Sequence, residues 1–133
     1  MGDLTRNLSR SEFACNCGCG FDTVDFDLPK VIQDVVDHYQ HIFSTGDIRV
    51  KITSGSRCKK YSKLLNLSVK SQHVFAKAAD ITIYDKISGK EIPTSDVAAY
   101  LEQRYPTSHG IGRYHTHTHI DVRKIKARWD NRK

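Results

Sequence analysis

The 133-residue chain contains no long hydrophobic run. No apolar stretch approaches the roughly 18–20 residues that a membrane-spanning helix needs, so we expect no membrane span. The N-terminal sequence, MGDLTRNLSRSEF, lacks the apolar segment of a secretory signal peptide. We therefore expect a protein that is made in the cytoplasm without a signal peptide.

The chain also lacks internal repeats and low-complexity linkers. Hydrophobic residues make up 38% and charged residues 27% of the sequence, which is ordinary for a globular protein. A chain of this length forms one domain with a hydrophobic core of its own. We expect a single domain over residues 1–133, present as a monomer.

Acidic residues are fewer than basic ones: the chain has 15 Asp and Glu and 21 Lys and Arg, which gives a net charge of +6. A basic surface favours polyanions such as nucleic acid, anionic lipid or a bacterial cell wall, although a basic tail also simply aids solubility. The basic residues are not interleaved with aromatic side chains on which nucleotide bases stack. We expect no nucleic-acid partner.

Cysteine is scarce, and three of the four cysteines stand close together as Cys15, Cys17 and Cys19, far from Cys58. They can be small buried thiols under a turn. One of the three can instead form a disulfide with Cys58. Two or three of them can also hold a structural metal ion together with Cys58, although the spacing differs from that of a zinc finger. All three interpretations stay open from the sequence.

The hydrophobic pattern predicts alternating helices and strands. Apolar residues recur every three or four positions after Leu28, which predicts a helix up to Phe43. A second helix is expected from residue 94 or 95 until just before Pro106. Strands are expected at 48–53, 78–84, 110–114 and 116–122, and a loop or short helix at 55–69. This pattern predicts an α+β domain with a mainly antiparallel sheet flanked by helices.

Three histidines and an aspartate occupy every second position near the C-terminus. On a strand, His117, His119 and Asp121 share one face, and His115 can join them. The alternative is a polar surface strip. A catalytic zinc ion needs three protein ligands and an open position, and one strand seldom supplies all three. His73 and Asp80 can complete such a site if the strand of Asp80 lies beside the strand of His119.

The residues around these positions resemble a known family. The sequence Ser71-x-His73-x-x-Ala76-x-Ala78-x-Asp80 resembles the S-x-H-x-x-G-x-A-x-D motif of the zinc D-alanyl-D-alanine carboxypeptidases, and His119-Ile120-Asp121-Val122-Arg123 resembles their H-V-D-V-R segment. Further similarity to short bacterial and phage members extends the resemblance from about residue 9 to 129. It is carried by segments 11–20, 53–58, 110–114 and 127–129. The resemblance implies the fold that the DD-peptidases share with the hedgehog domain.

The resemblance also implies roles for individual residues. His73, Asp80 and His119 match the ligands of Zn²⁺. Arg57 matches an arginine that holds the substrate or the developing oxyanion, and Ser71 matches a serine that binds near the metal or substrate. His117 is the candidate for a general base or a stabiliser of the tetrahedral intermediate, with Asp121 as its competitor. Ala76 stands where the family motif has glycine.

The resulting hypothesis is a zinc peptidase that hydrolyses peptidoglycan stem peptides next to D-alanine. It acts as a D,D-carboxypeptidase or an endopeptidase, and the sequence leaves this choice open. Without a signal peptide it reaches the cell wall after phage lysis and holin export, or as part of a virion. The alternative is a non-catalytic zinc-containing module that binds cell wall or a virion partner.

Overall fold

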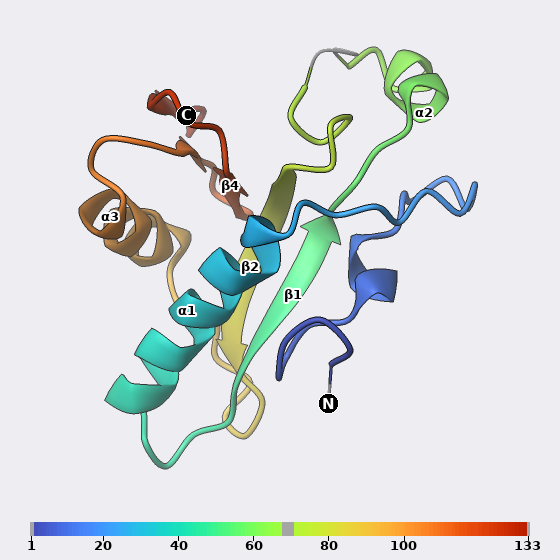
Figure 1. Ribbon diagram of the computed structural model, residues 1–133. Helices are drawn as coiled ribbons and strands as arrows, with labels where there is room; N and C mark the ends of the chain where they lie inside the picture. Colours follow the sequence, from blue (N-terminus) through green and yellow to red (C-terminus); the bar gives the residue numbers. More distant parts are fainter. Residues whose placement is uncertain (1, 68–70, 133) are drawn as a thin grey trace.

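The computed structural model describes residues 2–67 and 71–132, and Figure 1 shows their arrangement. The predicted α+β class with a mainly antiparallel sheet is confirmed. The elements, in chain order, are η1 (Arg10–Phe13), α1 (Asp27–Ile42), β1 (Ile48–Ser54), α2 (Lys59–Leu64), β2 (Ala78–Asp85), α3 (Thr94–Arg104), β3 (Gly110–Arg113), β4 (Thr118–Asp121) and β5 (Ala127–Asp130). None of the described helices is long and apolar enough to cross a membrane.

The five strands form one sheet in the order β1-β2-β4-β3-β5. Neighbouring strands are antiparallel except for β3 and β5, which run parallel. The strand of Asp80 is therefore the direct neighbour of the strand of His119, and these two residues are partners in the register of β2 and β4. This is the arrangement that a shared metal site requires.

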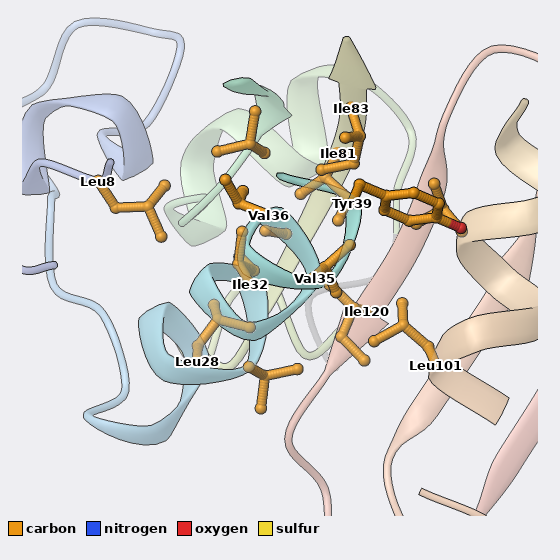
Figure 2. Packing of buried hydrophobic residues seen from close by; sticks show 14 of the residues in the cluster. Leu8, Leu28, Ile32, Val35, Val36, Tyr39, Ile81, Ile83, Leu101 and Ile120 are labelled. Carbon is orange, nitrogen blue, oxygen red and sulfur yellow. The ribbon is translucent and has the colours of Figure 1, made fainter. Parts of the chain in front are cut away.

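The hydrophobic core lies between the sheet and the two long helices. Ile81, Ile83 and Ile120 are fully buried on the sheet face that α1 and α3 cover, as Figure 2 shows. Side chains alternate between the two faces of a strand, so Asp80 and His119 lie on the opposite face. Packing of the apolar residues thus fixes which face carries the polar ones, because a slip of one residue would reverse both.

Two details differ from the sequence-based expectations, and a third agrees with them. β4 begins only at Thr118, so His115 and His117 lie in the connection from β3 rather than on the strand. β5 was not predicted, because its four residues show no alternation of apolar and polar side chains. The segment expected at 55–69 contains the short helix α2, and its last two residues lie outside the described part of the chain.

Candidate metal centre

The centre of the site is a row of residues that crosses four strands. Asp80 on β2 is opposite His119 on β4, which is opposite Gly112 on β3, which in turn pairs with Trp129 on β5. A Cβ atom on Gly112 would lie 2.3 Å from Trp129 Nε1. Because glycine leaves this space open, the indole reaches across β3, and its ring centroid lies 4.8 Å from that of His119.

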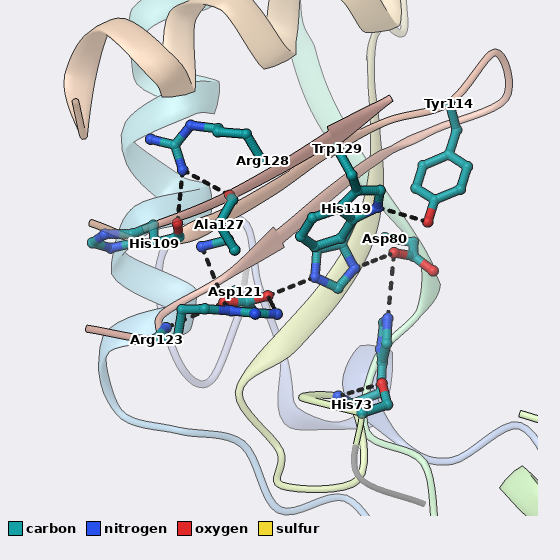
Figure 3. A network of polar contacts seen from close by, with 12 residues as sticks. His73, Asp80, His109, Tyr114, His119, Asp121, Arg123, Ala127, Arg128 and Trp129 are labelled. Carbon is teal, nitrogen blue, oxygen red and sulfur yellow. Dashed lines mark hydrogen bonds and ion pairs between the residues drawn. The ribbon is translucent and has the colours of Figure 1, made fainter. Parts of the chain in front are cut away.

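A second row places a carboxylate behind the first. Asp121 on β4 is opposite Gly110 on β3, and its Oδ2 lies 2.2 Å from the position that a Cβ atom on Gly110 would occupy. Asp121 is fully buried. Its Oδ2 lies 2.8 Å from Nε2 of His119, and its two oxygens accept hydrogen bonds of 2.7 Å each from the guanidinium of Arg123. Figure 3 shows this chain of contacts.

His73 approaches from the turn before β2. The backbone at Ala76 has φ of 60°, the left-handed conformation that glycine adopts without strain. This conformation and the hydrogen bond from Ala76 N–H to His73 C=O, 3.2 Å long, reverse the chain into β2. His73 Nε2 then lies 3.4 Å from Asp80 Oδ1. The position where the family motif has glycine is therefore one where the backbone requires a positive φ.

The hydrogen bonds of the two histidines determine which nitrogens point inward. His73 Nδ1 lies 2.7 Å from the carbonyl oxygen of Gly55, and His119 Nε2 faces the Asp121 carboxylate. Both partners can only accept, so these nitrogens carry the protons. The lone pairs of His73 Nε2 and His119 Nδ1 then point toward Asp80 Oδ1, which lies 3.1 Å from His119 Nδ1.

Three electron-pair donors that face one another require a proton or a cation between them. His73, Asp80 and His119 each offer one ligand atom, and these atoms lie within 4.8 Å of one another. Two imidazoles and one carboxylate are a usual set for a zinc ion that keeps an open position. The carbonyl and carboxylate behind the histidines are the partners that orient metal-binding imidazoles. The residues present therefore fit the zinc ion that the sequence implied.

The site is electrostatically coupled. Burial raises the pKa of Asp80, but a proton shared with His119 or His73 outweighs this effect and holds that pKa well below its ordinary value. Burial lowers the pKa of His119, but its bonds to Asp121 and Asp80 raise it above the ordinary 6.5. Burial lowers the pKa of His117, and the nearby Asp80 charge only partly offsets this. Asp80 is thus ionised and His117 is neutral at neutral pH.

A cleft of about 510 Å³ opens over these ligands. Arg57, Ser71 and His117, for which the sequence analysis expected roles near the substrate or the metal, all line it. The Ser71 hydroxyl also accepts the backbone N–H of His73, 3.2 Å away. Asp121 does not line the cleft. Among the described residues that do, Asp80 is the only acidic one.

Residues on β5 and before β4 complete the wall of the cleft. Tyr114 stacks on His117 with ring centroids 4.3 Å apart, and its hydroxyl accepts a 2.9 Å hydrogen bond from Trp129 Nε1. Arg123 also lines the cleft. The sequence analysis gave these three residues no role. The similarity of segments 110–114, 119–123 and 127–129 to family members was the available signal.

One comparison with known proteins identifies a family for the chain. Neither a search of curated proteins nor a search of solved structures found a match to the chain. The sequence model of the family described as peptidase M15 matches residues 6–121, which is most of the chain and includes all three ligand candidates. The chain therefore belongs to the peptidase M15 family of zinc peptidases.

Proposed function

We propose that the protein hydrolyses peptidoglycan stem peptides next to D-alanine, as a D,D-carboxypeptidase or endopeptidase. The observation that carries the proposal is the convergence of His73, Asp80 and His119 at the floor of a cleft that Arg57 and Ser71 also line. When bound to these ligands, zinc supplies a water with a pKa of about 7 and polarises the substrate carbonyl.

Arg57 is the group that recognises the anionic part of the substrate. Its side chain is buried in the cleft wall, and its backbone N–H donates a 3.0 Å hydrogen bond to the His73 carbonyl. The arginine is thus fixed relative to the metal ligands. A guanidinium binds a carboxylate through two parallel hydrogen bonds, so Arg57 holds the terminal carboxylate of the peptide or stabilises the developing oxyanion.

His117 is the better placed of the two candidate bases. In the tautomer in which Nδ1 donates to Thr116 Oγ1, 2.9 Å away, Nε2 is free to accept a proton and lies 3.8 Å from Asp80 Oδ2. From there it takes the proton of the attacking water and later returns it to the leaving amine. Asp121 acts differently: behind His119, it orients the imidazole rather than exchanging a proton with the substrate.

The proposed setting is the bacterial cell wall. The net charge of +6 suits an anionic wall, and the resemblance to short bacterial and phage members supports a monomeric lysin or virion component. It would reach the wall after phage lysis and holin export, or with the virion.

The test is mass spectrometry of the soluble products released from purified peptidoglycan. We expect D-alanine or uncross-linked muropeptides, lost on chelation and restored by zinc, and the products identify the bond. The variants His73→Ala and Asp80→Ala should each release nothing. Full activity in either purified variant would contradict the proposal.

One observation favours a second candidate, a zinc-containing module that binds cell wall without cleaving it. Among the described cleft residues, no carboxylate other than the proposed ligand Asp80 is available as a base. If His117 does not supply that function, the site can bind but not hydrolyse. Co-sedimentation with several wall types, with zinc bound and no product released, would establish this alternative.

A further inference from the structure

A second cluster of metal-binding side chains lies outside the cleft. The Sγ atoms of Cys15, Cys17, Cys19 and Cys58 all lie within 4.8 Å of one another. Cys15 Sγ is 3.4 Å from Cys17 Sγ and 3.8 Å from Cys58 Sγ, and Cys17 and Cys58 are 3.7 Å apart. A disulfide bond is only about 2.05 Å long, so these are four free thiols that converge on one point.

The spacing matches a tetrahedral thiolate site. With Zn–S bonds of about 2.3 Å, the sulfurs of a regular tetrahedron lie roughly 3.8 Å apart. The three sulfur separations among Cys15, Cys17 and Cys58 span 3.4 to 3.8 Å. Cys17 and Cys19 are exposed, so a role as small buried thiols fits at most Cys15. A single disulfide would bring only two sulfur atoms together, whereas four converge here.

The backbone is shaped to bring the sulfurs together. Gly18 and Gly20 have φ of 80° and 89°, which lets the chain turn tightly between and after the clustered cysteines. Backbone N–H groups also point at the sulfurs: Cys58 N donates to Cys15 Sγ at 3.4 Å and Tyr61 N to Cys58 Sγ at 3.3 Å. Such donors stabilise negative charge on sulfur, as the outer partners of a metal site do.

We propose that Cys15, Cys17, Cys19 and Cys58 bind a zinc ion in a closed, structural site separate from the catalytic one. Four thiolates leave no open position for substrate. The site joins the segment after η1 to the start of α2. Next to it, the Ser56 N–H donates a 2.8 Å hydrogen bond to the Phe13 carbonyl, and Arg57 precedes Cys58. The ion thereby holds the segment that carries Arg57.

The proposal is independent of the peptidase function and is tested by counting and identifying bound metal. The full chain, expressed with zinc and dialysed, should contain two zinc ions per chain by elemental analysis. The double variant Cys17→Ser, Cys19→Ser should contain one, and so should His73→Ala. Asn16→Ser is the matched control, because Asn16 lies between two of the cysteines, and it should keep both ions.

X-ray absorption at the zinc edge separates the two sites. In His73→Ala we expect a single shell of sulfur at about 2.3 Å, and in the double cysteine variant only nitrogen and oxygen at about 2.0–2.2 Å. Unchanged zinc content in the double cysteine variant would overturn the proposal. So would an iron–sulfur absorption in the wild-type protein, or fewer than four titratable thiols after chelation and denaturation without reductant.

Discussion

Replacing Asp121 with asparagine tests how the site holds its metal. The Asp121 carboxylate accepts one hydrogen bond from His119 Nε2–H and two from the guanidinium of Arg123. An asparagine has nearly the same shape but only one accepting oxygen. Because Asp121 Oδ1 also accepts the backbone N–H groups of Gly110 and Arg123, the asparagine oxygen takes that position and the NH₂ group faces His119. His119 then loses the partner that fixes its tautomer and directs Nδ1 toward Asp80.

The expected magnitude follows from the role of such outer partners. Losing one typically weakens metal binding about 10–100-fold, which corresponds to roughly 1.4–2.7 kcal/mol. The substitution should reduce the stability of the fold only moderately, because the Arg123 side chain is 31% exposed and water can replace the lost hydrogen bond. Asp121→Asn should therefore fold but bind zinc at the catalytic site 10–100-fold more weakly.

The assay is a competition titration with a chromophoric chelator. It is performed in the Cys17→Ser, Cys19→Ser background, so that only one site is titrated. Asp130→Asn is the matched control, because Asp130 pairs with Arg132 two residues later in the same way but on the surface. The control should bind zinc normally. Unchanged zinc affinity in Asp121→Asn together with lost turnover would refute the reasoning and restore Asp121 as a catalytic base.

Three further predictions concern single positions. Ala76→Gly relieves about 1–2 kcal/mol of strain from the left-handed backbone. It also loses roughly 0.8 kcal/mol from burial of the methyl group and roughly 0.4–1 kcal/mol because the unfolded chain becomes more flexible. Chemical denaturation should therefore show a free energy of unfolding within about 1 kcal/mol of the wild-type value. Ala98→Gly, in the buried face of α3, should instead lower the free energy of unfolding by about 2 kcal/mol. If both variants lost the same stability, the positive φ of Ala76 would be contradicted. Burial and the hydrogen bond to Asp34 raise the pKa of Tyr100 to about 12 from its ordinary 10. The folded state therefore keeps the phenolic proton at a higher pH than the unfolded state does. The stability advantage of wild type over Tyr100→Phe should be full below pH 10 and decline between pH 10 and 12. His117→Ala should lower kcat about 10²–10⁴-fold with zinc content unchanged, and an unaffected kcat would exclude it as the base.

The sequence brought the three ligand candidates together through the alternation around His119 and through the family resemblance around His73 and Asp80. Alternation on a strand placed His119 and Asp121 on one face, and the structure agrees. Their different surroundings were not predictable, because the depth of Asp121 depends on the space over Gly110. Gly110 belongs to the neighbouring strand β3, and the sequence around Asp121 does not show which strand will pair with it.

The same reason explains what the sequence missed around the cleft. Trp129 reaches His119 only because Gly112 leaves room between them, and β5 is held by pairing with β3 rather than by a hydrophobic pattern of its own. The strand expected over 116–122 begins late, so His117 lies in the connection from β3 to β4, where its Nε2 is 3.8 Å from Asp80 Oδ2. For the cysteines, the sequence left three interpretations open, because the position of Cys58 in the chain does not determine how close its sulfur lies to the other three.

The most direct test of the central claim is D-alanine release from a synthetic stem peptide ending in D-alanyl-D-alanine, or from a cross-linked dimer of such peptides. The protein is assayed as purified, after chelation, and after zinc is restored. We predict release of D-alanine or cleavage of the dimer that disappears with chelation, returns with zinc, and is absent in His73→Ala. No cleavage of either substrate by fully zinc-loaded protein would contradict the peptidase and leave the binding module as the account of this site.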